Sequence, residues 1–394
     1  MEKAIMQAME EALWERLFRK ETNLFYDFVS SYDAASALDH LPYPDEIAHQ
    51  VPNPCGWGTG MEDSMLNGGA MLDILCMRGE KEEKKRASRV FQGLRLSATV
   101  HGKRGFIARS ISPRDGRSCY INSSRDQYTL FVYGIWKYFH SSLSSEKEKE
   151  QIRDLLSGIA EFCEKETMLL RLDGAPGLVC RLTGEIGLHE VMRLPMFFAA
   201  AWDVTRNPHW FDLYRHFAHP GIQKNLEFSS KKNWWYMELN QMVVSLLLIA
   251  SFDSELAPLC RNILAMAAGQ AEKMLAAHRE YWKNIHLDTS ALPGDWRSAP
   301  FHLRMSDPEM TGALYHGYPY YCPQLNPEFR RVQEKLRELG QVAFVLFSIQ
   351  KTSEWTEYFF QEVSQIDFSA HATYAPMNLL HAWTALNTKS GIHP

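Results

Sequence analysis

Residues 61–100, MEDSMLNGGAMLDILCMRGEKEEKKRASRVFQGLRLSATV, contain two helical patterns joined by a short turn. The first pattern, residues 61–77, is mostly apolar, which is typical of a helix that is buried on all sides. After the turn Arg78-Gly79-Glu80, residues 80–100 carry their charge on one face, which is typical of a helix that covers a core. The segment therefore predicts one buried helix followed closely by one covering helix.

The same pairing repeats along the whole chain of 394 residues. The predicted buried helices are 61–77, 126–139, 188–204, 237–252, 331–350 and 371–386. The predicted covering helices are 3–30, 80–100, 146–166, 208–217, 255–283 and 353–363. Pro195 should kink the third buried helix or mark its true start.

Six buried and six covering helices in strict alternation predict an all-α fold, the (α/α)6 barrel or six-hairpin toroid. No Gly/Ser-rich linker interrupts the chain, so we expect one domain over residues 1–394. A stacked helical solenoid is the structural alternative. It would require a sequence repeat of fixed period, and the sequence has none.

Long loops precede the predicted buried helices, whereas each buried helix passes to the next covering helix through a few residues. The predicted long loops are 31–60, 101–125, 167–187, 218–236 and 284–330. If neighbouring helices are antiparallel, all these loops lie on one side of the molecule. Long loops in a compact domain are usually functional, so we expect the site on that side.

Composition excludes several classes of function. A net charge of -5 argues against a dedicated binder of nucleic acid or of an anionic membrane, because both need a basic surface. No apolar segment is long enough to span a bilayer, and residues 1–20 resemble an amphipathic helix and not a signal peptide. The seven cysteines lack CxxC spacing, which indicates reduced thiols and favours the cytoplasm.

Two loop-to-helix junctions have the same arrangement, with an aspartate close to the start of a predicted buried helix. Residues 54–64, PCGWGTGMEDS, and residues 122–128, NSSRDQY, each end a long loop and begin a predicted buried helix. Asp63 and Asp126 would then lie at the same rim on neighbouring inner helices, whose axes are typically roughly 8–10 Å apart. Two carboxyl groups at about that separation suit hydrolysis of a glycosidic bond, so we predict Asp126 and Asp63 as acid and base.

The structural alternative for both junctions is helix capping. Glu62 and Asp63 would be stabilised by the helix dipole, and Ser123 or Ser124 is a suitable N-cap for the second helix. Against capping alone, the series Arg125-Asp126-Gln127 is more polar than a cap requires. We therefore predict Glu62, Arg125 and Gln127 as substrate-binding residues.

Aromatic and basic residues gather in the same long loops. Aromatic rings stack on the C–H faces of sugars, although loop packing is an equal alternative for each; the candidates are Trp57, Trp234, Trp235, Tyr236, Trp296, Tyr315, Tyr318, Tyr320 and Tyr321. Glu238 follows the tryptophan pair by one helical turn and joins the predicted binding residues. Basic groups would bind an acidic sugar or simply pair with nearby carboxylates; they are Arg104, Arg109, Arg125, Arg171, Arg181, Arg297, His101, His189, His302 and His316.

At these junctions the chain resembles the six-hairpin glycosidase superfamily, and within it the unsaturated glucuronyl and rhamnogalacturonyl hydrolases. Met61-Glu62-Asp63 and Arg125-Asp126-Gln127 carry the resemblance through their position and residue type. In that family an aspartate at the mouth of an inner helix acts as general acid/base. The resemblance places this role on Asp126, with Asp63 assisting. The family's Trp-x-Arg-Gly-x-Gly-Trp stretch is absent, which favours a different branch.

We therefore expect a glycoside hydrolase that acts on a glycan or oligosaccharide without a cofactor. His189-Glu190 lacks the second histidine of HExxH, so we expect no metal site. One alternative on the same fold is a polysaccharide lyase that uses Tyr315, His316 and Arg109. The other is a non-catalytic helical protein that binds glycans or serves as a scaffold.

Overall fold

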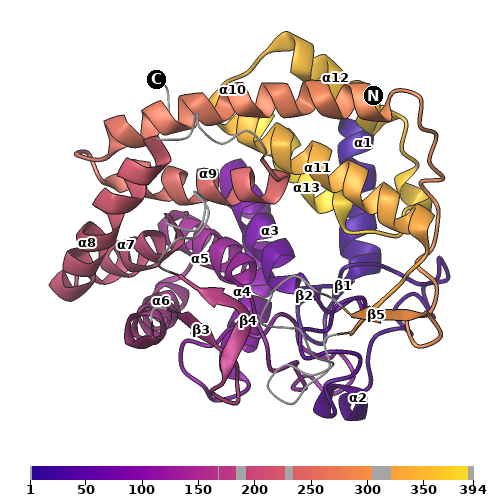
Figure 1. The fold of residues 1–394 in the computed structure, drawn as a ribbon, viewed down its shortest axis with the longest axis horizontal. Coiled ribbons are helices and arrows are strands. Elements are labelled where there is room, and N and C mark those ends of the chain that lie inside the picture. The colour runs from indigo at the N-terminus through magenta and orange to yellow at the C-terminus, as the bar shows by residue number, and fades with distance from the viewer. Residues whose placement is uncertain (1, 167, 183–191, 227–233, 304–320, 389–394) are drawn as a thin grey trace.

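The structure is a computed structural model that describes residues 2–166, 168–182, 192–226, 234–303 and 321–388. Helices dominate these residues (Figure 1). Their bounds are α1 Glu2–Glu11, α2 Pro44–Ala48, α3 Ser64–Arg78, α4 Lys84–Thr99, α5 Arg125–His140, α6 Glu146–Glu166, α7 Arg193–Thr205, α8 Pro208–Asn225, α9 Tyr236–Phe252, α10 Ala257–Trp282, α11 Pro327–Ile349, α12 Ser353–Ser364 and α13 Ala375–Asn387.

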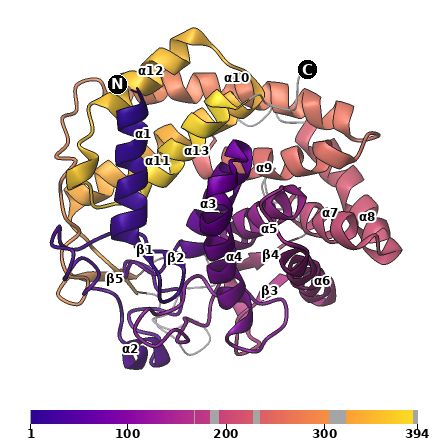
Figure 2. The same ribbon diagram turned by 180° about the vertical axis from the view of Figure 1, so that it is seen from behind.

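The helices form two concentric layers (Figures 1 and 2). The inner ring consists of α3, α5, α7, α9, α11 and α13; each packs against the next, and α13 packs against α3 to close the ring. The outer layer consists of α1, α4, α6, α8, α10 and α12, each in contact with an inner helix. The predicted (α/α)6 barrel is therefore confirmed.

Composition explains which helices lie inside. The inner helix α9 carries MVVSLLLIASF, and thirteen of its residues are buried. Such a helix has no polar face to offer to water, so it must be surrounded by other helices. By contrast, the outer helix α6 has charged residues through most of its first two turns, EKEKEQIRD, and buries one stripe.

Two glycines bring α3 and α5 unusually close. A Cβ atom on Gly69 would lie 2.1 Å from the carbonyl oxygen of Leu130, and one on Gly134 would lie 2.6 Å from the carbonyl oxygen of Gly69. Any side chain at either position would force the two helices apart. This close contact matters for the site, because Asp63 immediately precedes α3 and Asp126 lies in the first turn of α5.

Three short antiparallel hairpins occur in the described loops, where the sequence predicted no strands. They are β1 Phe18–Arg19 with β2 Leu24–Phe25, β3 Met168–Leu170 with β4 Pro176–Arg181, and β5 Phe301–Leu303 with β6 Tyr321–Pro323. Each pairs backbone N–H and C=O groups that an irregular loop would leave unsatisfied. Figure 1 shows the labelled strands on the side of the barrel where the long loops gather.

Several predicted helix starts differ from the structure by four or five residues, and two other predicted boundaries differ by more. The predicted helix 3–30 ends as a regular helix at Glu11, and after a π-helical turn at Ala12–Leu17 the chain forms the β1–β2 hairpin. Phe18 and Phe25 pair across that hairpin and pack with Trp14, which favours the strand pair over a continued helix.

The predicted loop 218–236 also begins too early, because α8 continues through Pro220 to Asn225. Pro220 is exposed, so the carbonyl group that loses its backbone donor can reach water. By contrast, Pro195 lies in the first turn of α7, where its missing N–H is not needed, and it marks the start of that helix as predicted.

Candidate functional site

A cleft of about 730 Å³ opens at the rim where the long loops meet the first turns of the inner helices. Its walls come from the loops before α3 and α5, the start of α9, the β5–β6 hairpin and the start of α11. The charged and ionisable side chains that line it are Glu62, Asp63, Arg109, Arg125, Asp126, His302, Cys322, Arg330 and Arg337. Both predicted aspartates therefore line one cleft on the side where the loops predicted a site.

Asp63 immediately precedes α3, and four side chains contact its carboxylate. Gln127 Nε2 donates to Oδ1 at 2.8 Å, and the Tyr374 hydroxyl donates to Oδ2 at 2.9 Å. Arg109 lies 4.0 Å from Oδ1, and Arg337 lies 3.4 Å from Oδ2. The side chain makes no capping hydrogen bond to α3, so capping does not explain this residue.

The backbone before α3 is fixed by Asp27, a buried residue that was not among the predicted site residues. Its carboxylate accepts hydrogen bonds from the backbone N–H groups of Glu62, at 2.6 Å, and Asp63, at 3.0 Å. Burial and the nearby carboxylates of Asp63 and Glu62 raise the pKa of Asp27 well above its usual range, and the two N–H groups oppose that shift. A single aspartate in the apolar stretch LFYDFV, residues 24–29, was the available signal.

Asp126 lies in the first turn of α5 and differs from Asp63 in its surroundings. Its side chain is 31% exposed, and Arg193 Nη2 donates to Oδ1 at 2.8 Å. Among the described residues Arg193 is its one hydrogen-bond partner, which leaves Oδ2 without a bond from the protein there. Ser124 precedes α5 without a side-chain capping bond, so helix capping, the structural alternative at this junction, is not observed there.

Arg193 is a second residue that was not among the predicted site residues. It is the first residue of α7, it is fully buried, and it also donates to Oε1 of Gln241 on α9. A guanidinium with several fixed donors can hold two acceptors at once, which a flexible ammonium cannot do as well. The Asp126 side chain is thereby oriented by the two inner helices that follow α5.

Gln127 connects the two aspartate-bearing helices. Its side chain is fully buried; Nε2 donates to Asp63, and Oε1 accepts from the backbone N–H of Leu66 at 3.4 Å. It does not line the cleft, so its observed contacts fix the position of α3 against α5.

The cleft is rich in arginine. Arg109 is buried and donates to the carbonyl oxygen of Glu62 at 3.1 Å. Arg330 donates to Gln333 at 3.1 Å and has no carboxylate within ion-pair distance among the described residues. Burial opposes the charge on Arg337, but Tyr374 and Asp63 favour it, and the net effect raises the pKa of Arg337.

Two of the predicted aromatic residues line the cleft. Trp57 is buried in its wall, and Trp235 is 52% exposed at the start of α9. Trp296 lies elsewhere: it is fully buried, and its indole N–H donates to the carbonyl oxygen of His40 at 2.6 Å. Trp234 is half-buried outside the cleft lining, and the Glu238 carboxylate accepts the backbone N–H of Trp235 at 3.2 Å.

Several basic loop residues form ion pairs or hydrogen bonds outside the cleft. The ion pairs are Arg104 with Glu161 at 2.7 Å, Arg171 with Asp173 at 2.5 Å and Arg297 with Glu46 at 2.7 Å, and His101 lies 3.1 Å from the carbonyl oxygen of Ser97. Candidates outside the described residues are His189, Tyr315, His316, Tyr318 and Tyr320. The histidine that does line the cleft is His302.

The described part of the chain contains no group of three or more His, Cys, Asp and Glu side chains placed to hold a metal ion. The same residues include no helix with the length and apolar character needed to cross a membrane.

No family model and no curated protein sequence matches this chain. Its fold is similar to that of a sugar epimerase from a ruminal bacterium, with a TM-score of 0.50 and 10% identity over 98% of this chain and 99% of that one. Lower similarity is found to a D-mannose isomerase (TM-score 0.45, 12% identity, 98% and 96% covered) and to the cellobiose 2-epimerase from Spirochaeta thermophila DSM 6192 (0.44, 10%, 98% and 96%). The similarity to the sugar epimerase supports the (α/α)6 barrel over nearly the whole chain.

Proposed function

We propose that the chain is a carbohydrate-active enzyme that hydrolyses a glycosidic bond in the rim cleft. The observation that carries this proposal is the pair Asp63 and Asp126, which begin neighbouring inner helices and line one cleft in unequal surroundings. Hydrolysis of a glycoside uses two carboxyl groups with different roles, since one transfers a proton while the other stays charged.

We assign the proton transfer to Asp126. Arg193 holds one carboxyl oxygen, and the other is available to the glycosidic oxygen of a bound substrate. In its protonated form Asp126 gives a proton to the leaving oxygen as the C–O bond breaks. Water then adds to the sugar carbon and returns a proton to Asp126, which restores the starting state.

We assign the fixed negative charge to Asp63. Gln127, Tyr374, Arg109 and Arg337 hold its carboxylate before any substrate arrives. A preorganised carboxylate stabilises the positive charge that develops on the sugar ring in the transition state, without reorientation during the reaction.

The cleft favours a sugar that carries a negative group. Arg330 brings a positive charge to the wall, and no described carboxylate lies within ion-pair distance of it. Trp57 and Trp235 add flat apolar surface for stacking on a sugar ring. The similar fold of a sugar epimerase is consistent with a sugar substrate.

A second candidate reaction is epimerisation or isomerisation of a sugar. His302 lines the cleft and is a suitable general base for removing a proton from a carbon next to a carbonyl group. A sugar epimerase is among the solved structures with a similar fold. This reaction and hydrolysis give different products and are separated by one assay.

The test is a panel of neutral and acidic glycosides and free reducing sugars, with products followed by NMR. Hydrolysis gives two sugars or a sugar and an alcohol, whereas epimerisation gives an isomer of the same mass. Asp126→Asn should lower kcat by at least about 100-fold, since a general acid/base contributes roughly that much or more. Asp212→Asn, an exposed position on α8, is the matched control and should keep full activity. Wild-type rates in Asp126→Asn would exclude the assignment.

A further inference from the structure

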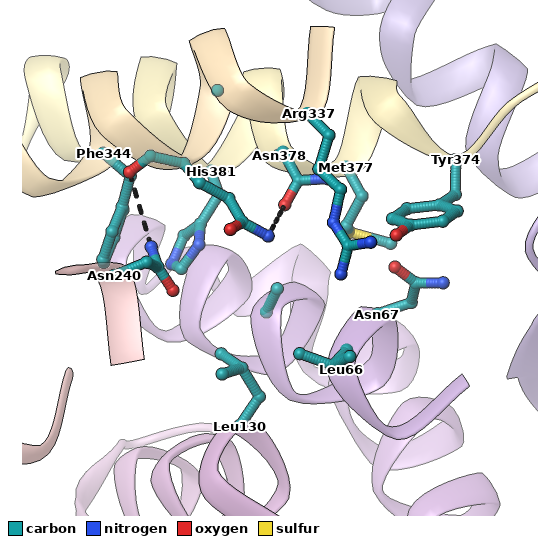
Figure 3. Close-up of a pocket in the computed structure, with 13 residues that line it drawn as sticks. Leu66, Asn67, Leu130, Asn240, Arg337, Phe344, Tyr374, Met377, Asn378 and His381 are labelled. Atoms are coloured by element: carbon teal, nitrogen blue, oxygen red, sulfur yellow. Dashed lines mark hydrogen bonds between the residues drawn. The ribbon is translucent and has the colours of Figure 1, made fainter. Parts of the chain in front are cut away.

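A second, much smaller cavity lies among the inner helices (Figure 3). Its volume is about 20 Å³, and it is surrounded by α3, α5, α9, α11 and α13. Its polar lining residues are Asn67, Asn240, Arg337, Gln341, Tyr374, Asn378 and His381. Arg337 lines both this cavity and the cleft, so its side chain lies between them.

Three buried polar atoms around this cavity have no hydrogen-bond partner among the described residues. They are Nε of Arg337, Oε1 of Gln341 and Nδ2 of Asn378. Gln341 is 7% exposed, and its Nε2 donates to Oδ1 of Asn378 at 3.2 Å. Reversing both amides keeps that bond and again leaves one donor and one acceptor open, so the imbalance does not depend on amide assignment.

We propose that this cavity binds one ordered water molecule. The water accepts hydrogen bonds from Nε of Arg337 and Nδ2 of Asn378 and donates one to Oε1 of Gln341. The volume of about 20 Å³ exceeds the roughly 10–15 Å³ that a single water requires. Three polar partners also fit the two to four that buried waters have.

The water connects the barrel interior to the cleft through Arg337. In Figure 3 the Arg337 side chain extends from α11 with Tyr374 and Asn67 on one side and Asn378 on the other. Its Nη2 atom lies 3.4 Å from Oδ2 of Asp63, and its guanidinium carbon lies 5.4 Å from the centre of the Tyr374 ring. A hydrogen bond from Nε to the water restrains the guanidinium, which keeps Nη2 directed at Asp63.

Gln341 and Asn378 are therefore positioning residues: they act on Asp63 through the water and Arg337 and do not line the cleft. Their effect on turnover rests on the function proposed above, whereas the water site does not. The water site and the effect on turnover are therefore tested by separate experiments.

The water is tested by a high-resolution crystal structure of the unaltered protein. We expect one full-occupancy water within hydrogen-bond distance of Arg337, Gln341 and Asn378. A cavity without that water, or three atoms that bond to other protein groups, would overturn the proposal. This measurement requires no substrate and no variant.

The positioning role is tested with Asn378→Leu, which has similar volume but cannot bond to water. We expect its crystal structure to lack the water and to show Arg337 displaced from Asp63. On any glycoside that the wild type cleaves, kcat should fall roughly 10- to 100-fold with little change in KM, as expected for a small misplacement in the site. Asn378→Ser, which supplies a hydroxyl that can bond to water and leaves room for a second water, should recover part of that loss.

The matched control is Asn387→Leu, the same substitution at the exposed end of α13. It should leave kcat, KM and the position of Arg337 unchanged. An Asn378→Leu protein with Arg337 in place and wild-type kcat would refute the positioning role. A wild-type protein that contains the water but cleaves no glycoside would instead refute the proposed function and leave the water site intact.

Discussion

The hydroxyl of Tyr374 donates a hydrogen bond of 2.9 Å to Oδ2 of Asp63. Tyr374 precedes the last inner helix, α13, and Asp63 precedes the first, α3. The backbone N–H of Tyr374 also donates to the carbonyl oxygen of Asp27, whose side chain holds the backbone before α3. The contact that closes the ring at the rim is therefore the same contact that fixes a carboxylate in the cleft.

Removing the Tyr374 hydroxyl should weaken both the closure of the helix ring and the positioning of the Asp63 carboxylate. Tyr374→Phe should lower the free energy of unfolding by about 1.5–3 kcal/mol, because Asp63 loses a buried hydrogen bond to a charged group. Urea denaturation measures the change, and kcat on a cleaved glycoside should fall with it. Tyr281→Phe, at a side chain that is 65% exposed on α10, is the control and should match wild type. Equal midpoints for Tyr374→Phe and wild type would show that the contact contributes nothing.

The space around two glycines predicts opposite effects for alanine substitutions, one at the α3–α5 contact and one on α10. Gly69→Ala should destabilise the protein by about 1–3 kcal/mol or more, since its Cβ would meet the Leu130 backbone at 2.1 Å. Gly269→Ala on α10 has nothing within 4 Å of the added Cβ and should stabilise by about 0.5–1 kcal/mol. Thermal unfolding of both variants provides the comparison. The same sign for both would contradict the packing described here.

Helix order and the rim of the site followed from local sequence. Apolar and amphipathic runs differ in composition over ten or more residues, so their alternation indicates which helices lie inside. The junctions at Asp63 and Asp126 were likewise visible, because each ends a loop and begins an apolar run. Both side chains line one cleft, as that pattern predicted.

The partners of these aspartates were not predictable in the same way. Tyr374 is separated from Asp63 by 311 residues, and Arg193 from Asp126 by 67, so no periodicity connects them. Trp296 is the opposite case, a residue that the sequence placed among the binding candidates but that lies buried outside the cleft. Its sequence context is that of a loop aromatic, and only the folding of that loop over His40 determines that its ring is buried and its N–H satisfied.

The double contact of Arg193 predicts that lysine cannot replace it. A lysine keeps the positive charge but not the geometry that reaches Asp126 and Gln241 together. Arg193→Lys should therefore lower kcat roughly ten-fold or more through misorientation of Asp126, with a smaller change in KM. Arg206→Lys, at an exposed arginine that pairs with Asp203, is the control and should retain wild-type kinetics. Unchanged kcat in Arg193→Lys would exclude a positioning role for Arg193.

Buried histidines predict how stability changes with pH, and His278 on α10 gives the clearest test. Its Nδ1 lies 2.7 Å from the Tyr358 hydroxyl and its Nε2 lies 2.9 Å from the carbonyl oxygen of Lys335, which suits the neutral ring. Burial lowers the pKa of His278 from 6.5 to about 4. The unfolded chain therefore binds a proton more tightly than the folded protein, so the stabilising contribution is complete above pH 6.5 and is lost as the pH falls towards 4.

Glutamine at this position keeps one donor and one acceptor but does not titrate. In His278→Gln the slope of unfolding free energy against pH should decrease by up to about 1.4 kcal/mol per pH unit within that window, the value for one proton. Urea denaturation at several pH values between 4 and 7 measures the slope. His219→Gln, an exposed position on α8, is the matched control and should reproduce the wild-type slope. If His278→Gln also reproduces it, the neutral buried ring is not a source of acid sensitivity.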